Sequence, residues 1–491
     1  MAKKVIVIGA GFSGLAAATS LAHKGLDVTL LEKHDIPGGR ARYFETGNYK
    51  FDMGPSWYWM PDVFERYFQR FGKQPSDYYE LVRLDPSYRV VFGQDDFMDI
   101  PANMGELEML FESLEPGSSK QLRKFLQQAE YKYQVGINDL VYKPSRSLTE
   151  FVDMKLLTDM VRMNIFQSFH KHIRQYFRHE KILQLMEFPI LFLGAVPQNT
   201  PALYSLMNYA DISLGTWYPK GGMHKIIEGM VKLAEEKGVK FEFGQDVQQL
   251  ALTGNKVDTV ITNKGEFTAD SVIAGADYHH VEHNLLPKSH QSYSDSYWDK
   301  RVMAPSSLIY YLGVKKELGQ LLHHNLFFDR DFGPHSKEIY EDPKWPSDPL
   351  FYACLASKTD NTIAPIGSEN LFLLMPVAPA LQDGDEVREK YFDIMLDRME
   401  KVTGQEVRSS IEYKRSYAHK DFVSDYNAFK GNAYGLANTL MQTAILKPSL
   451  KSKKVKNLYY TGQLTVPGPG VPPSLISGQV VAKEVIKEFG R

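Results

Sequence analysis

The segment Val5-Ile-Val-Ile-Gly-Ala-Gly-Phe-Ser-Gly14 decides the fold of this chain. Its first half is a short apolar run that predicts a buried parallel strand over residues 4–8, and its glycines lead directly into a helical pattern over residues 15–24. A second strand is predicted over residues 27–31 and ends at Glu32. Strand, glycine-rich turn, helix, strand and terminal acid occur in this order within the first 32 residues. This order predicts a dinucleotide-binding βαβ unit.

Each glycine of this loop has its own physical role. Gly9 allows the tight turn from strand to helix, and Gly11 lets the backbone approach a pyrophosphate without a Cβ in the way. Gly14 lets the helix lie close to the strand. The helix N-terminus then offers free N–H groups and the positive end of its dipole to the phosphates.

Two further features indicate FAD as the bound dinucleotide. Glu32 can accept hydrogen bonds from ribose hydroxyls, and an acid at this position disfavours the 2′-phosphate of NADP. A second glycine-rich turn, Gly38-Gly39-Arg40, follows it and suits the larger FAD molecule, with an Arg able to reach phosphate. The candidate cofactor-binding residues from this end of the chain are Gly9, Gly11, Phe12, Ser13, Gly14, Glu32, Lys33, Gly39 and Arg40.

The C-terminal region supplies a second glycine-rich turn between a strand and a helix, over residues 457–478. The helix that begins near Val471 directs its N-terminus at this turn, where it can stabilise negative charge on a reduced flavin. The candidates here are Gly462, Gln463, Gly470 and Val471.

Length and composition limit the remaining possibilities. A chain of 491 residues predicts two or more domains, and a net charge of −2 gives no basic field for nucleic acid. The single cysteine, Cys354, cannot form an intramolecular disulfide and reads as a buried strand residue. No signal peptide is expected, and no run reaches the ~20 apolar residues of a spanning helix. We therefore expect a soluble or peripheral protein.

The predicted fold class is α/β. We expect a Rossmann-type FAD-binding domain with an inserted α+β substrate domain and a helical, membrane-associating part. The FAD-binding domain is assigned to residues 1–75, 220–290 and 450–491, and the substrate region to 76–219 and 291–449. Helices are predicted over 118–134 and within 155–185, and strands over 239–250, 257–262, 265–268 and 270–274.

Several separated segments match one family. They are Gly38-Gly39-Arg40, residues 51–55, 203–206, 217–223 and 269–277, Asp421-Phe422 with Tyr426-Asn427, and residues 457–478. With these segments the chain resembles the bacterial-type phytoene desaturases, which are FAD-dependent carotenoid desaturases of the flavin amine oxidase superfamily. Residues 57–61 resemble a Bacteroidetes-type subgroup. Gly54, Pro55 and Val247 complete the set of candidate cofactor-binding residues.

The resemblance implies an activity and a cellular setting. It implies double bonds introduced into phytoene toward lycopene by hydride transfer to flavin N5 and proton loss, with quinone or oxygen as electron acceptor. Because phytoene lives in the bilayer, we expect a cytoplasmic enzyme that is peripheral on the inner face of the cell membrane. A helical segment of about residues 130–190 is expected to dock there.

The sequence singles out no catalytic residue and no metal site. The possible proton acceptors are Glu187, Asp211, Asp421 and Asp425. His323 and His324 are adjacent, so on a strand their rings are expected to point to opposite faces and not to share a metal. The same reasoning applies to His279 and His280.

Three alternatives stay open. Within the same family, the chain could desaturate another carotenoid, as a hydroxycarotenoid 3,4-desaturase or a C30 diapophytoene desaturase, or act as a carotenoid isomerase or saturase. A flavin amine oxidase is the second alternative, although no lysine motif for flavin N5 is evident. The third is a non-enzymatic prenyl-lipid carrier like the Rab GDP-dissociation inhibitors, which share this architecture.

Overall fold

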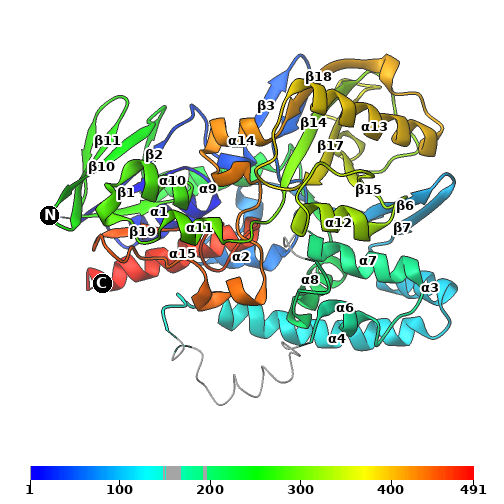
Figure 1. The fold of residues 1–491 in the computed structure, drawn as a ribbon, viewed down its shortest axis with the longest axis horizontal. Helices are drawn as coiled ribbons and strands as arrows, with labels where there is room; N and C mark the ends of the chain where they lie inside the picture. The colour runs from blue at the N-terminus through cyan, green and yellow to red at the C-terminus, as the bar shows by residue number, and fades with distance from the viewer. Residues whose placement is uncertain (1, 148–149, 151–166, 192–195, 491) are drawn as a thin grey trace.

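The structure, a computed structural model, describes residues 2–147, 150, 167–191 and 196–490 (Figure 1). A five-stranded parallel sheet lies near both chain ends, with the strand order β19-β13-β1-β2-β9. Its strands are β1 (Lys4–Ile8), β2 (Asp27–Glu32), β9 (Lys240–Phe243), β13 (Ser271–Ala274) and β19 (Leu458–Tyr460). The sheet therefore brings together three parts of the chain that are far apart in sequence, and the predicted α/β class is confirmed.

Helices from the two ends of the chain pack against each other beside this sheet. Helix α1 (Phe12–His23) contacts both α15 (Val471–Glu488) and α9 (His224–Glu236). The contact with α15 is so close that a Cβ on Gly478 would lie 2.1 Å from the Ser13 carbonyl oxygen. Figure 1 shows α15, in red, beside α1.

A small antiparallel sheet extends this region. It consists of β10 (Val247–Thr253), β11 (Lys256–Thr262) and β12 (Glu266–Thr268). The single strand predicted over residues 239–250 is wrong: the chain turns at Gly244, whose φ is +66°. As a result β9 joins the parallel sheet and β10 the antiparallel one.

A seven-stranded sheet forms the second half of the molecule, in the order β18-β14-β17-β16-β15-β6-β7. Alternate residues of β14 enter two different cores: Tyr310 packs against Phe392 of helix α13 (Asp385–Thr403), and Tyr311 faces the core that includes Phe51. The strands are β6 (Tyr88–Gly93), β7 (Asp96–Ile100), β14 (Ser306–Val314), β15 (His324–Phe327), β16 (Phe351–Leu355), β17 (Glu369–Val377) and β18 (Ile411–Tyr417).

Helices gather near the edge of this sheet that is formed by β6 and β7 (Figure 1). They are α3 (Met104–Leu114), α4 (Ser118–Val135), α6 (Phe169–Ile173), α7 (Glu180–Leu191) and α8 (Leu206–Asn208). The helix predicted over 118–134 is confirmed. Of the helices predicted within 155–185, α6 and α7 are present, and residues 155–166 lie outside the described residues. No helix within the described ranges is long and apolar enough to cross a membrane.

Short elements join these parts, and they are α2 (Pro61–Gln69), α10 (Tyr278–His280), α11 (Asp295–Asp299), α12 (Phe332–Tyr340), α14 (His419–Tyr426), β3 (Tyr43–Thr46), β4 (Tyr49–Asp52), β5 (Leu81–Arg83) and β8 (Trp217–Pro219). The five-stranded and the seven-stranded sheet are each assembled from chain segments that are not adjacent in sequence. The division into an FAD-binding and a substrate domain stays a prediction.

Candidate functional site

The loop between β1 and α1 is held in a shape that only glycine allows at two positions. Gly9 has a φ of +96° and donates its N–H to the Leu31 carbonyl at 2.7 Å. A Cβ on Gly14 would lie 1.9 Å from the Gly9 carbonyl oxygen, well inside any permitted contact. Gly9 and Gly14 therefore serve the fold of the loop itself.

Gly11 is different, because the protein leaves space beside it. Its φ of −81° suits any residue, and the nearest atom to an added Cβ is the Gly38 carbonyl oxygen at 4.0 Å. Helix α1 has no side-chain cap at its N-terminus, where Phe12 and Ser13 lie. An open flank next to an uncapped helix N-terminus fits a phosphate group, since the unpaired N–H groups and the helix dipole favour an anion there.

Glu32 ties the end of β2 to this loop. Its carboxylate accepts hydrogen bonds from the N–H groups of Ala10 at 2.7 Å and His34 at 3.0 Å. Each carboxylate oxygen keeps acceptor capacity for a ribose hydroxyl. The Lys33 ammonium instead donates to the Ser424 carbonyl at 2.8 Å, so it links this loop to α14.

The second glycine turn packs directly on the first. Gly38 donates its N–H to the Ala10 carbonyl at 2.9 Å, and a Cβ on Gly39 would lie 3.4 Å from the Gly11 Cα. The buried Nε of Arg40 has no hydrogen-bond partner among the described residues, and an orphaned charged donor of this kind fits an anionic ligand. Gly54 is packed equally tightly, because its Cβ would meet the Arg40 carbonyl oxygen at 2.6 Å; Pro55 follows it.

The C-terminal candidates meet the N-terminal loop. Gly462 has a φ of +106° and donates its N–H to Ser477 Oγ at 3.0 Å, and its Cβ would lie 3.3 Å from Ser13 Oγ. Gly470, with a φ of +108°, precedes Val471, the first residue of α15. The site is therefore assembled from both ends of the chain.

Other predicted and unpredicted residues complete this region. Val247 is buried in the core that includes Ile8 and Leu31, beyond the end of β2. Asn432, which the sequence analysis missed, accepts from both Arg40, through its carbonyl at 3.2 Å, and Gln463, through Oδ1 at 3.0 Å. Only the tertiary fold brings residue 432 here, and nothing in its local sequence marked it.

Three of the four possible proton acceptors are held in ion pairs. Arg174 pairs with Glu187 at 2.5 Å, Arg388 with Asp421 at 2.7 Å and Arg42 with Asp425 at 2.5 Å. These three carboxylates are therefore already engaged by arginine side chains.

Asp211 alone of the four has no cationic partner among the described residues. It is 3% exposed and accepts hydrogen bonds from the Tyr88 hydroxyl at 2.7 Å and the Thr216 hydroxyl at 3.3 Å. Burial raises the pKa of this carboxyl to about 7, although both hydroxyl donors oppose the shift. A carboxyl that titrates near neutral pH has the property required of a general base.

An aromatic cluster surrounds Tyr88, the residue whose hydroxyl binds Asp211. The Tyr88 ring contacts Trp57 and Phe188, each with a centroid separation of 5.3 Å. Trp59 reaches the same group through Thr216, whose hydroxyl accepts from the indole N–H at 2.8 Å. Because Trp57 follows Gly54 and Pro55 closely in sequence, these rings connect the predicted cofactor segment to Asp211.

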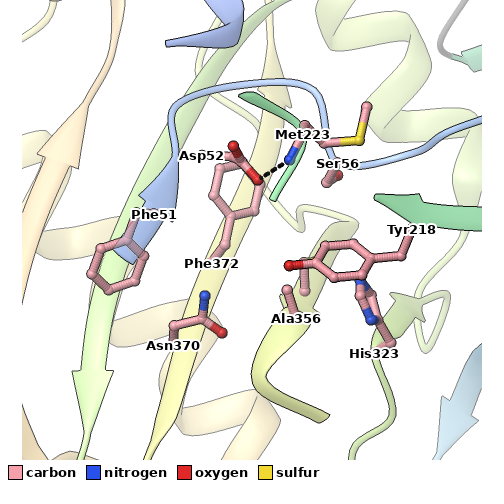
Figure 2. Close-up of a pocket in the computed structure, with 10 residues that line it drawn as sticks. Phe51, Asp52, Ser56, Tyr218, Met223, His323, Ala356, Asn370 and Phe372 are labelled. Atoms are coloured by element: carbon pink, nitrogen blue, oxygen red, sulfur yellow. Dashed lines mark hydrogen bonds between the residues drawn. The ribbon is translucent and has the colours of Figure 1, made fainter. Parts of the chain in front are cut away.

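The structure differs from the expectation that the rings of His323 and His324 point to opposite faces, because their centroids lie 4.4 Å apart. Strand β15 begins at His324, so strand alternation does not orient His323. A ring nitrogen of each histidine and the Cys354 sulfur all lie within 4.8 Å of one another. Figure 2 shows His323 in this region, beside Tyr218 and across a small cavity from Asp52. The other adjacent pair follows the expectation, because His279 stacks on His283 and not on its neighbour His280.

Burial sets the charge state of this group. Desolvation lowers the pKa of His323 to about 3 and lowers the pKa of His324 well below its ordinary value. The same cause raises the pKa of the Cys354 thiol to about 12. All three side chains are therefore uncharged at neutral pH.

Comparison with known proteins places this architecture in a family. The model of the flavin containing amine oxidoreductases matches residues 12–486. The chain is 43% identical to a carotenoid 3,4-desaturase of Haloarcula japonica, over 99% of this chain and 98% of that protein. It is 32% identical to a zeta-carotene-forming phytoene desaturase of Myxococcus xanthus, over 99% of this chain and 94% of that protein. An oxidoreductase structure from Methanosarcina mazei shares the fold, with a TM-score of 0.63 at 16% identity, over 99% of this chain and 100% of that one.

FAD is the cofactor that this family membership implies, and the open flank of Gly11 and the orphaned Arg40 donor fit its phosphates. The chain is therefore an FAD-dependent oxidoreductase of the flavin containing amine oxidoreductase family, on the branch that holds these carotenoid desaturases.

Proposed function

We propose that this protein introduces a 3,4 double bond into a carotenoid. Full-length similarity to a carotenoid 3,4-desaturase at 43% identity, against 32% for a phytoene desaturase, supports this reaction over the conversion of phytoene toward lycopene. Phytoene desaturation is the second candidate. In either case two adjacent carbons lose a hydride and a proton, and the two C–H bonds that break leave one new C=C bond.

The residues that would hold FAD are those of the two glycine turns and the C-terminal loop. When bound there, FAD supplies the acceptor for the hydride. The chain itself has to position the polyene, exclude water and take the proton.

We assign proton acceptance to Asp211. Of the four possible acceptors it is the one without a cationic partner among the described residues, and its pKa of about 7 leaves a large ionised fraction at neutral pH. The Tyr88 ring, whose hydroxyl binds the carboxylate, can stabilise positive charge on the substrate, because aromatic faces attract cations. The hydrogen bond from Tyr88 orients the carboxylate that receives the proton.

A substrate panel tests the reaction. The FAD-loaded protein is incubated with liposomes that contain either phytoene or a 1-hydroxycarotenoid that is saturated at carbons 3 and 4. A quinone and oxygen are both present as electron acceptors. We expect the hydroxycarotenoid to lose two hydrogens at carbons 3 and 4 and to absorb at longer wavelength. Turnover of phytoene alone would assign the second candidate, and turnover of neither would remove both.

We also propose that the protein works at a membrane surface, with quinone or oxygen as the terminal electron acceptor. An apolar patch supports this: Val302 is 44%, Met441 74% and Leu446 44% exposed. A hydrogen bond joins the segment of Val302 to the segment of Met441: the side-chain N–H of Gln442 donates to the Val302 carbonyl at 2.8 Å. Part of the segment predicted to dock, residues 148–149 and 151–166, lies outside the described residues.

Vesicle co-sedimentation tests this patch. Met441→Glu is expected to weaken binding to zwitterionic vesicles by about tenfold, because burial of a Met side chain contributes roughly 1.5–3 kcal/mol. Met109→Glu is the matched control, since Met109 is 66% exposed on α3, outside the patch. If wild-type protein stays in the supernatant, or if both variants lose binding equally, the patch is not the docking surface.

A further inference from the structure

Two buried histidines and the single cysteine of the chain converge beside the seven-stranded sheet. His324 lies directly opposite Cys354 in the antiparallel pair of β15 and β16, so the two side chains share one face of the sheet. His323 precedes β15 and turns its ring toward the same place, with ring centroids 4.4 Å apart. The exposed fractions of His323, His324 and Cys354 are 5%, 0% and 6%.

Hydrogen bonds fix which nitrogen of His324 carries the proton. The Tyr352 hydroxyl donates to Ser56 Oγ at 2.9 Å, so it acts as the acceptor of the 2.6 Å hydrogen bond from His324 Nδ1. The proton therefore sits on Nδ1, and Nε2 keeps a free lone pair. His323 Nδ1 lies 2.7 Å from Thr359 Oγ1, and with the Thr359 hydroxyl as the acceptor its Nε2 also keeps a free lone pair.

Both Nε2 atoms are buried and have no hydrogen-bond partner among the described residues. A buried acceptor without a partner is unfavourable, and a ligand that accepts lone pairs would satisfy both nitrogens. Histidines that bind metals almost always donate their other N–H to an outer oxygen, and the hydroxyls of Tyr352 and Thr359 hold those positions here.

We propose that His323, His324 and Cys354 form a binding site for Zn²⁺ or a similar borderline-soft cation. Two imidazole nitrogens and one sulfur are ligands that such ions prefer. A tetrahedral zinc site places its ligand atoms about 3.5 Å apart. Here one ring nitrogen of each histidine and the Cys354 sulfur lie within 4.8 Å of one another, so metal binding requires these side chains to draw closer together.

A neighbouring cavity, which His323 and Cys354 line, offers room for a fourth ligand. It measures about 30 Å³ and is lined in part by His323, Cys354 and Asp52 (Figure 2). That volume accommodates about two water-sized atoms. On binding, the Cys354 thiol gives one proton to water and its sulfur bonds the metal as a thiolate, with no change in oxidation state.

Cobalt spectroscopy on the full-length, FAD-loaded protein tests the site, with the protein purified without metal-affinity resin. Because Cys354 is the only cysteine, a thiolate-to-cobalt charge-transfer band can come from no other residue. We expect one Co²⁺ per chain, this band, and displacement of Co²⁺ by Zn²⁺. Cys354→Ser is expected to abolish the band, and Tyr352→Phe, which removes only the outer hydroxyl, to weaken binding by about 10–100-fold.

The control addresses the second group of possible ligands in the described residues, His279, His283 and Asp295. His283→Gln is expected to leave the band and the affinity unchanged. The proposal is overturned if wild-type protein with intact flavin absorbance shows no band at saturating Co²⁺. It is equally overturned if the band survives the His323→Gln/His324→Gln double change, or if His283→Gln abolishes it. These outcomes are independent of carotenoid turnover.

Discussion

A Gly11→Val variant is expected to fold and to purify without FAD. The protein leaves open space beside Gly11, with the Gly38 carbonyl oxygen 4.0 Å from an added Cβ, and the φ of −81° suits valine. The side chain would occupy the place that we assign to the pyrophosphate. Flavin absorbance per chain is therefore expected to fall at least tenfold, while the circular dichroism spectrum is retained.

The neighbouring glycine separates this effect from folding. Gly14→Val is expected to yield little soluble protein, because its Cβ would lie 1.9 Å from the Gly9 carbonyl oxygen. Gly265→Val is the neutral control, since no atom lies within 4 Å of an added Cβ there. A Gly11→Val protein that is as yellow as wild type would remove the loop from the cofactor site.

Asp211→Asn is expected to lose activity and to gain stability at alkaline pH. Asparagine has nearly the same shape but cannot accept the substrate proton, so turnover is expected to fall by a factor of about 10²–10⁴. Wild-type activity is expected to rise with pH through about 7, as the carboxyl ionises. Glu187→Gln is the matched control, because Glu187 is held by Arg174, and it is expected to keep the wild-type pH profile.

The stability effect has the opposite sign to that of an ordinary ion-paired acid. Between its ordinary pKa and about pH 7, folded Asp211 holds a proton that the unfolded chain has lost. The free energy of unfolding therefore falls as the pH rises through this window. Because Asn cannot ionise, the free energy of unfolding of the variant does not fall in this window. The wild-type protein is expected to lose up to about 4 kcal/mol of it by pH 8. Urea unfolding at pH 5 and pH 8 measures the difference; an inactive variant that is equally destabilised at both values would make Asp211 purely structural.

The cofactor loops could be predicted because their determinants are local. The glycines at 9, 11 and 14 stand at fixed offsets from a strand and a helix, and the meeting of the two chain ends follows from the parallel sheet that both enter. The break between β9 and β10 was missed, because a continuous apolar–polar pattern does not reveal the left-handed turn at Gly244.

The chemistry around the substrate could not be predicted in the same way. Four acids were equivalent in sequence, and only the fold gives three of them an arginine partner and leaves Asp211 buried without one among the described residues. The histidine pair was misjudged because the exact start of β15 decides where the His323 ring points. Such one-residue differences at the end of a strand depend on tertiary packing.

The central claim is that FAD on this chain oxidises a carotenoid, and an anaerobic single turnover tests it most directly. FAD-loaded protein is mixed with liposomes that contain a 1-hydroxycarotenoid, without quinone or oxygen, and flavin and polyene absorbance are followed together. We predict that the flavin bleaches as the polyene absorbance moves to longer wavelength, with one new double bond for each FAD. A flavin that stays yellow with both a hydroxycarotenoid and phytoene would contradict the claim, as would a purified protein that is colourless and cannot be reconstituted with FAD.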